Sequence, residues 1–339
     1  MVWWIRYLDY PRLQILIAML VMLVALALLP RTRLGMVGMV ALAGACAYDA
    51  WILFPYTSIP APSQVTADSC PADRRFRLLE VNVQMTNRHD HRLLNIVRDA
   101  KPDVVWFQET NEWWTQELSS LADTMPYRVD ATRPNYFGAH LYSRLELVDP
   151  QVHNLTSSAN PSVFTGVRLP SGDVVMLYAV HPRPPQTGQS VRERNAQLMA
   201  TALAARNDSR PHVIAGDLNS VPWEGIVRHT QRVGRFLDPR VGRGMKITWN
   251  ANSAIFRWPL DHILPGPQFT VVSLQVLPAF GSDHRPYLAV LCVDPTAAAR
   301  QSPPALRPTD IASAREVVRL GQNVAEKTGY KGRIEDQGS

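Results

Sequence analysis

The chain has 339 residues, a formal net charge of +6 and an apolar content of 46%. That length suits one large catalytic domain with additions, or two ordinary domains, and the apolar content is enough for a full core. The three cysteines form no C-x-x-C pair, so a zinc ribbon or a thioredoxin-like site has no support. The basic charge suits an anionic partner, whether a phosphate, a nucleic acid or a lipid headgroup, and does not choose among them.

Two apolar runs open the chain after an N-terminal segment, residues 1–12. Residues 13–29 contain only Gln14 as a polar side chain, and residues 34–54 are rich in Gly, Ala, Met and Val. Each run is about long enough to cross a bilayer as a helix, so together they predict a transmembrane hairpin. The alternative is a signal peptide followed by a buried core helix. The presence of a second run argues against it, and no A-x-A-like cleavage site follows the first run.

Positive charges around the hairpin bear on its orientation. Arg31 and Arg33 lie in the turn between the two runs, and the segment after the second run carries no charge. The positive-inside rule then places the turn in the cytoplasm and both ends outside. Arg6 and Arg12 argue the other way and are partly offset by Asp9. We therefore expect an extracytoplasmic domain.

The rest of the chain divides into three parts. A Pro-, Ser- and Thr-rich tether is predicted at 55–74, a catalytic domain at 75–293, and a Pro/Ala-rich tail at 294–339 that contains an exposed helix and is otherwise disordered. Within the domain, helices are predicted at 90–100 and 192–205. Strands are predicted at 76–83, 104–108, 139–144, 163–169, 174–180, 212–215, 260–264, 270–277 and 287–293. Many strands with few helices between them predict a layered α/β sandwich with antiparallel pairs.

Polar residues recur where these strands begin or end. They are Asn82, Glu109, His181, Asp217, Asn219, Asp261, Asp283 and His284. One carboxylate at a strand end means little, but a carboxylate or carboxamide at nearly every strand end predicts that one rim of the sandwich is a polar site.

This mixture of groups suits phosphoester hydrolysis assisted by a divalent metal. Mg²⁺ prefers oxygen ligands, and Glu109 and Asp283 fit that role. The Gly-Asp-Leu-Asn turn can hold both a water molecule and a phosphate oxygen. Histidines supply general acid or electrostatic help near neutral pH, and Asp261 can fix the tautomer of His284.

These motifs, in this order and spacing, resemble the endonuclease/exonuclease/phosphatase (DNase I-like) superfamily. The matching motifs are Glu-Val-Asn-Val, Gln-Glu, the histidine after the fifth strand, Gly-Asp-Leu-Asn, the aspartate of Leu-Asp-His-Ile-Leu, and Ser-Asp-His-Arg-Pro. The resemblance implies a four-layered α/β sandwich and Mg²⁺ or Mn²⁺ as cofactor.

The resemblance also implies a role for each residue. Glu109 would be the principal metal ligand, assisted by Asn82 and Asp283. In the same scheme the Asp217–Asn219 turn positions the attacking water. The two histidines, His181 and His284, contact the scissile phosphate, and Asp261 supports His284.

The hairpin and the Thr-Trp pair at Trp249 are similar to a bacterial subgroup, the YafD-like and VanJ-like proteins, although Asn250 stands where these often have Pro. This likeness implies a membrane-bound phosphatase or phosphodiesterase acting on a lipid-linked or surface phosphate outside the cytoplasmic membrane. Trp249 would belong to the substrate loop. Arg144 matches a position near the cleft of the family, where it would pair with substrate phosphate; an ordinary surface ion pair is the alternative.

The family fold pairs its first and last strands, and this pairing has a consequence for the cysteines. It brings Cys292 close to the start of the first strand and so to Cys70. A disulfide between them is therefore expected, which would fit an oxidising compartment.

Two other functions remain open. The first is a nuclease with the same mechanism, which would need a groove of interleaved basic and aromatic side chains. The second is a binding module that keeps the fold without catalysis, against which the full catalytic set argues.

Overall fold

The structure is a computed structural model that describes residues 8–29, 32–156, 160–185 and 191–328. Its helices are α2 Arg12–Ala27, α3 Arg33–Leu53, α4 Asp90–Ala100, α5 Glu112–Glu117, α6 Arg192–Arg206, α7 Gly225–Gly234 and α8 Asp310–Thr328. Its strands are β1 Arg75–Asn82, β2 Val104–Gln108, β3 Tyr127–Ala131, β4 Ala139–Ser143, β5 Leu147–His153, β6 Ser162–Arg168, β7 Val174–Ala179, β8 His212–Asp217, β9 Asp261–Pro265, β10 Phe269–Val276 and β11 Tyr287–Val293.

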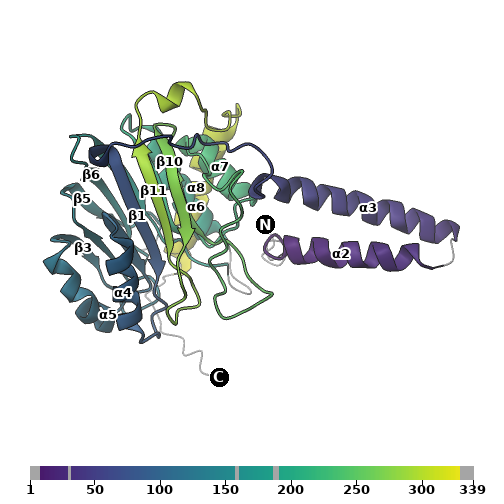
Figure 1. Cartoon of the computed structure of the whole chain (residues 1–339), viewed down its shortest axis with the longest axis horizontal. Coiled ribbons are helices and arrows are strands. Elements are labelled where there is room, and N and C mark those ends of the chain that lie inside the picture. Colours follow the sequence, from purple (N-terminus) through teal and green to yellow (C-terminus); the bar gives the residue numbers. More distant parts are fainter. Residues whose placement is uncertain (1–7, 30–31, 157–159, 186–190, 329–339) are drawn as a thin grey trace.

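The strands form two sheets that stack face to face (Figure 1). One sheet has the order β10-β11-β1-β2-β4-β3, and the other has the order β5-β6-β7-β8-β9. Neighbouring strands are antiparallel except for β1 with β2 and β7 with β8. Each sheet is therefore mixed, which agrees with the antiparallel pairs expected from many strands with few helices between them.

Alternation along the strands explains how the layers are held together. In β1, Phe76 and Leu78 pack between the two sheets, whereas Leu79 and Val81 pack on the outer side with Leu93 of α4. Successive side chains of a strand point to opposite faces, so one strand serves both cores. Helices α6, α7 and α8 cover the outer face of the second sheet. The order helix, sheet, sheet, helix confirms the predicted four-layered sandwich.

Helices α2 and α3 lie side by side as an antiparallel pair and project from one side of the sandwich (Figure 1). α3 has 21 residues, which is roughly 30 Å of helix. Among the described residues, only the stretch from Arg33 to Tyr56 is long and apolar enough to cross a membrane. α2 ends at Ala27, short of the predicted 13–29, and its 16 residues fall below the usual length of a span.

The segment after the hairpin is not a free tether. The backbone N–H of Ala67 donates to the carbonyl of Val271, and the N–H of Val271 donates to the carbonyl of Val65, both at 2.9 Å. Gln64 is fully buried and donates to the carbonyl of Phe269. These residues cover β10, whose edge would otherwise present unpaired backbone groups.

The tail helix is also docked, so the prediction of an exposed helix is wrong. In α8, Ala314 is fully buried, and Ile311 and Val317 pack on the same outer core as α6 and α7. Asp310 accepts hydrogen bonds from the guanidinium of Arg232 at 2.7 and 3.0 Å. The apolar residues of α8 recur at helical spacing because they form a face that covers the second sheet.

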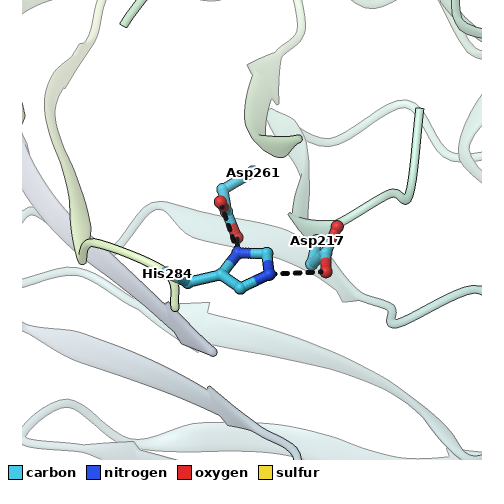
Figure 2. A group of neighbouring side chains, drawn as sticks. All are labelled: Asp217, Asp261 and His284. Carbon is cyan, nitrogen blue, oxygen red and sulfur yellow. Dashed lines mark hydrogen bonds and ion pairs between the residues drawn. The ribbon is translucent and has the colours of Figure 1, made fainter. Parts of the chain in front are cut away.

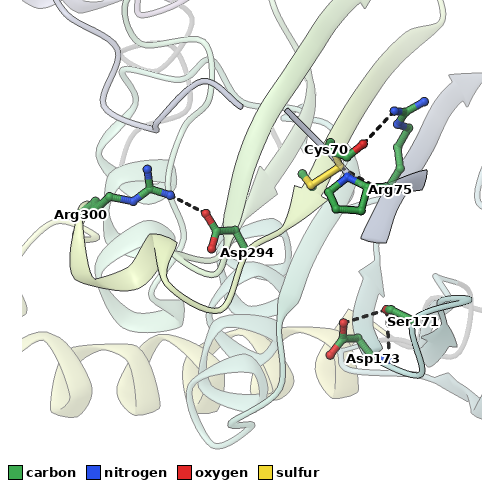
Figure 3. Close-up of a disulfide and its surroundings, with 8 residues drawn as sticks. Cys70, Arg75, Ser171, Asp173, Asp294 and Arg300 are labelled. Atoms are coloured by element: carbon green, nitrogen blue, oxygen red, sulfur yellow. Dashed lines mark hydrogen bonds and ion pairs between the residues drawn. A yellow bond between two sulfur atoms is a disulfide. The ribbon is translucent and has the colours of Figure 1, made fainter. Parts of the chain in front are cut away.

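Cys70 and Cys292 form the expected disulfide, with their Cα atoms 5.8 Å apart (Figure 3). The pairing of β1 with β11 explains why they meet, because Cys292 lies opposite Arg75 in the register. Arg75 also donates to the carbonyl of Cys70 at 3.0 Å, which holds the chain just before β1. The bond therefore joins the entry of the domain to its last strand.

Removing this disulfide should destabilise the protein strongly. The bond links positions 222 residues apart and so restricts a very large loop of the unfolded chain. Replacing Cys70 and Cys292 together by serine should lower the free energy of unfolding by roughly 2–5 kcal/mol and the melting temperature by about 10 °C. The measurement is thermal unfolding of the full chain in detergent. Cys46→Ala, which leaves the disulfide intact, is the control; equal melting of all three proteins would contradict the prediction.

Candidate active site

Polar residues end the inward-facing stripes of five strands. In β1 the inward positions run from Phe76 and Leu78 to Glu80 and then Asn82. The same parity places Gln108 of β2 inward, because Val104 and Trp106 face the core between the sheets. Asp217 ends β8, Asp261 begins β9, and Asp283 and His284 lie just before β11. Every second residue of these strands faces the space between the sheets, so the same alternation places apolar side chains in the core and polar side chains at one rim.

The end of β8 requires a glycine, which places Asp217. Gly216 has a φ of +144°, and a Cβ there would lie 1.8 Å from the carbonyl oxygen of Val180. The N–H of Asp217 donates to Oε1 of Gln108 at 2.8 Å, so this side chain links the two sheets at the rim. Only glycine allows the close approach of the chains that makes this link.

Asn219 is held by hydrogen bonds to four other residues. Its N–H donates to Oδ1 of Asp217 at 2.9 Å, and its side-chain amide donates to the carbonyl of Pro182 at 2.9 Å. Its own carbonyl accepts from the hydroxyl of Tyr10 at 2.7 Å and from the buried guanidinium of Arg194 at 2.8 Å. Asn219 has a φ of +49°, and these bonds hold the left-handed backbone that presents the side chain.

His284 lies between two carboxylates (Figure 2). Its Nδ1 contacts Oδ2 of Asp261 at 2.9 Å, and its Nε2 lies 3.6 Å from Oδ2 of Asp217. Burial alone would lower the pKa of His284, but the charges of Asp261 and Asp217 outweigh it and raise the pKa to about 10. The raised pKa of His284 favours the imidazolium form, which can donate from Nε2.

His181 has the opposite character. It is buried, and its Nε2 lies 3.9 Å from Oδ2 of Asp217. Burial, with the nearby charge of His284, lowers the pKa of His181 to about 3, so the ring is neutral. Its Nδ1 has no hydrogen-bond partner among the residues that the structure describes. The two histidines of the rim thus supply one charged and one neutral imidazole.

Glu109, Asn82 and Asp283 form the candidate metal site. Glu109 follows β2 with a φ of +59°, and its Oε1 accepts from the amide of Asn82 at 2.9 Å. Oδ2 of Asp283 accepts from the indole N–H of Trp249 at 2.9 Å. Burial raises the pKa of Glu109 to about 7 despite the Asn82 hydrogen bond, and the charge of Asp283 adds to the rise. Two carboxylates and an amide are hard oxygen ligands, so the set fits a divalent cation.

A second group, Asp217, Asp261 and His284, also has its ligand atoms within 4.8 Å of one another. His284 contacts Asp261 through Nδ1 and faces Asp217 through Nε2. Both ring nitrogens of His284 are therefore already engaged by carboxylates. We therefore interpret this group as an ion-pair network that acts beside the metal site.

The structure does not bring Arg144 to the rim, so its predicted contact with substrate is wrong. In the pairing of β2 with β4, Gln108 lies opposite Ala139, whereas Arg144 follows the other end of β4. It lies roughly 15 Å along the sheet from the site. There the guanidinium pairs with Asp103, as in the alternative of a surface ion pair.

Trp249 does lie at the rim, stacked on Trp258 at 4.8 Å between ring centroids and tilted against the ring of His284 at 6.4 Å. The remaining predicted residues also gather there.

Three residues at the rim were not identified from the sequence: Glu80, Tyr10 and Arg194. Glu80 is buried and accepts a hydrogen bond from Gln108. It lies two residues before Asn82 in β1, so the alternation of the strand could have predicted that both face the same side. Tyr10 and Arg194 carry no such signal, because their partner is Asn219, far along the chain.

The fold and site define a class of protein. The chain belongs to the Endonuclease/Exonuclease/phosphatase family, whose sequence profile matches residues 79–284. Members of this family are phosphoester hydrolases, and this protein is an enzyme of that class.

Solved structures share the fold at low sequence identity. TDP2 of D. rerio complexed with single strand DNA product gives a TM-score of 0.55 at 17% identity over 64% of this chain and 98% of that one. An endonuclease/exonuclease/phosphatase from Beutenbergia cavernae gives 0.52 at 19% over 65% and 72%. The human Nocturnin catalytic domain with bound sulfate anion gives 0.51 at 16% over 66% and 96%. Comparison with the curated proteins gives no match.

Proposed function

We propose that this protein is a membrane-anchored, Mg²⁺-dependent phosphatase or phosphodiesterase that acts on a lipid-linked or surface phosphate, in the manner of VanJ-like proteins. The observation that carries the proposal is where the hairpin meets the sandwich. The Tyr10 hydroxyl, two residues before α2, donates to the carbonyl of Asn219 at 2.7 Å. Ile52 and Leu53 of α3 pack in one cluster with Val221 and Leu260, next to the catalytic turns. An anchor in this place would hold the rim near the bilayer.

Charges and the disulfide support an extracytoplasmic site on a bacterial cytoplasmic membrane. Arg12, which counted against this orientation, pairs with Asp49 at 2.5 Å and with Asp9 at 2.6 Å. Its charge is therefore balanced, whereas the sequence between the two apolar runs contains Arg31 and Arg33 and no acidic residue. Disulfides persist in oxidising compartments, which favours the same side for Cys70–Cys292.

In the proposed reaction, Glu109 and Asp283 would hold the cation with the help of Asn82. Bound Mg²⁺ would neutralise charge on the phosphate and on the leaving oxygen. Asn82 also donates to Glu109 and approaches Asp217 at 3.4 Å, so one amide links the metal ligands to the groups that orient water.

The remaining rim residues act on water and phosphate. Oδ2 of Asp217 and the side chain of Asn219 orient the attacking water for in-line displacement. His284 donates a hydrogen bond from Nε2 to the charge that develops on phosphate, and Asp261 holds its ring. The neutral ring of His181 contacts a further phosphate oxygen.

A nuclease with the same mechanism is the second candidate. One observation favours keeping it: the D. rerio TDP2 structure of the same fold contains a single strand DNA product. Both candidate functions use the same phosphate chemistry at the rim. They differ in the molecule that carries the phosphate, which is a lipid-linked or surface phosphate in the first and a nucleic acid in the second.

A substrate panel tests the proposal. The full chain in lipid vesicles is given a polyprenyl pyrophosphate, sphingomyelin, plasmid DNA or single-stranded DNA, each with Mg²⁺ or with EDTA. We expect Mg²⁺-dependent release of phosphate or of the headgroup from a lipid substrate and little cleavage of DNA. Cleavage of DNA alone would reject the proposal in favour of the nuclease. Recovery of the protein in the soluble fraction after gentle lysis would reject the membrane anchor.

A further inference from the structure

The loop of residues 250–257 has its base at the rim and contacts the hairpin, and its tip is apolar. Trp249 and Trp258 form its base, stacked and paired through their backbones. At its tip Ile255 and Phe256 are 66% and 58% exposed. These two adjacent side chains form a small exposed apolar patch at the tip of the loop.

The tip lies level with the start of α2. Gln14, the polar residue in the first apolar run, donates from its side-chain amide to the carbonyl of Ile255 at 2.6 Å. Gln14 is the third residue of α2, so this bond fixes the tip beside the first turn of the helix. Tyr10 contacts the loop base edge-on, with its ring 5.8 Å from that of Trp258. The loop therefore lies beside the point where the apolar helices α2 and α3 leave the sandwich.

The charge of the loop suits an anionic lipid surface. From Lys246 to Leu260 the chain has no aspartate or glutamate, while Lys246 and Arg257 are basic. Arg257 is exposed and directly follows Phe256. A basic residue next to an aromatic one is typical of segments that rest in the headgroup layer.

The base of the loop touches the groups that would act on phosphate. The Trp249 indole donates to Asp283, and the N–H of Ala251 donates to the carbonyl of Asp283 at 2.7 Å. Trp249 also pairs with His284 through the backbone. A surface that binds the tip would therefore set the distance between the rim and that surface.

We propose that Ile255 and Phe256 insert into the membrane interface beside the hairpin, so that the rim receives the phosphate of an amphiphile directly from the headgroup layer. This inference rests on the proposed membrane anchoring and adds a second membrane contact to it. It also specifies the substrate class as a phosphate ester or pyrophosphate carried by a molecule that stays in the bilayer. Soluble phosphate esters offer the same chemistry, and the experiment separates the two sources.

The first measurement locates the loop. In a Cys46→Ala background, Ile255→Cys carries an environment-sensitive fluorophore, and the full chain is reconstituted in phosphatidylglycerol–phosphatidylethanolamine vesicles with doxyl-labelled lipid as quencher. The matched control is Val152→Cys, an exposed position on the edge strand β5, which lies on the side of the sandwich away from the hairpin (Figure 1). We expect a blue-shifted, quenched signal at 255 and an unquenched one at 152. An unquenched signal at 255 in vesicle-bound protein overturns the inference and leaves the anchor standing, whereas loss of the protein from vesicles would reject the proposed function itself.

The second measurement uses the double variant Ile255→Ser with Phe256→Ser. Hydrolysis of a lipid-linked pyrophosphate in vesicles should fall about tenfold. Hydrolysis of the soluble ester bis(p-nitrophenyl) phosphate should stay at the wild-type rate, which also shows that the variant folds. An equal loss on both substrates would mean that the tip shapes the site itself, and unchanged rates on both would mean that it has no membrane role; either result overturns the inference.

Discussion

Replacing His284 by alanine should lower kcat by about 10³-fold, within the range found for positioned acid–base and electrostatic groups. The substitution removes the imidazolium that faces Asp217 and leaves the buried carboxylate of Asp261 without its cation. The loss should appear in kcat more than in KM, because His284 contacts charge that develops during the reaction. Steady-state kinetics on the substrate found by the panel provide the measurement.

Two further variants make this result specific. His91→Ala is the matched control, because its side chain is 93% exposed at the start of α4. It should keep wild-type kinetics. Asp261→Asn should lose part of the activity, because it removes the charge that holds His284 as an imidazolium. A His284→Ala enzyme within tenfold of the wild type would contradict the role given to this residue.

Replacing Glu109 by glutamine should abolish metal-stimulated activity and weaken metal binding by at least about tenfold. A neutral amide of the same size keeps the shape of the site but removes one of its two carboxylate charges, and hard cations depend on those charges. Calorimetric titration with Mg²⁺ and Mn²⁺ measures binding, and activity across the same metal series measures function.

Glu112→Gln is the control for this substitution, because Glu112 is an exposed residue of α5 three positions away. It should titrate with metal as the wild type does. EDTA should inactivate the wild-type enzyme reversibly, with recovery on added Mg²⁺. If Glu109→Gln kept wild-type affinity for metal and a normal response to EDTA, the metal site would have to lie elsewhere on the rim.

The sequence predicted most of the sandwich because its central strands are buried on both faces and read as apolar runs that end at a polar residue. The two strands it missed, β3 and β5, lie at the sheet edges. Most residues of β3 are exposed, so it has no apolar alternation to detect. β5 contains Pro150, which sequence reasoning treats as a strand breaker but which an edge strand tolerates.

The candidate site likewise contains residues that the sequence could predict and residues that it could not. Residues within recognisable motifs, such as Asp217 and His284, were found because their chemistry and spacing are local in the chain. Arg144 was misplaced because a motif match ignores strand direction, and β4 runs away from the rim. Tyr10 and Arg194 escaped because they act on Asn219 through contacts that span 209 and 25 residues, which only the folded chain brings together.

The docking of residues 64–67 along β10 bears on how the enzyme can be produced. A shortened chain beginning at Arg75, where the domain starts in the sequence, would lose this cover along with the Tyr10 bond to Asn219. It would expose the edge of β10 to pairing with another molecule. It would also leave Cys292 without its disulfide partner Cys70. Such a fragment is expected to aggregate and to show low activity. The folding unit therefore begins before Arg75, upstream of the domain boundary that the sequence predicts.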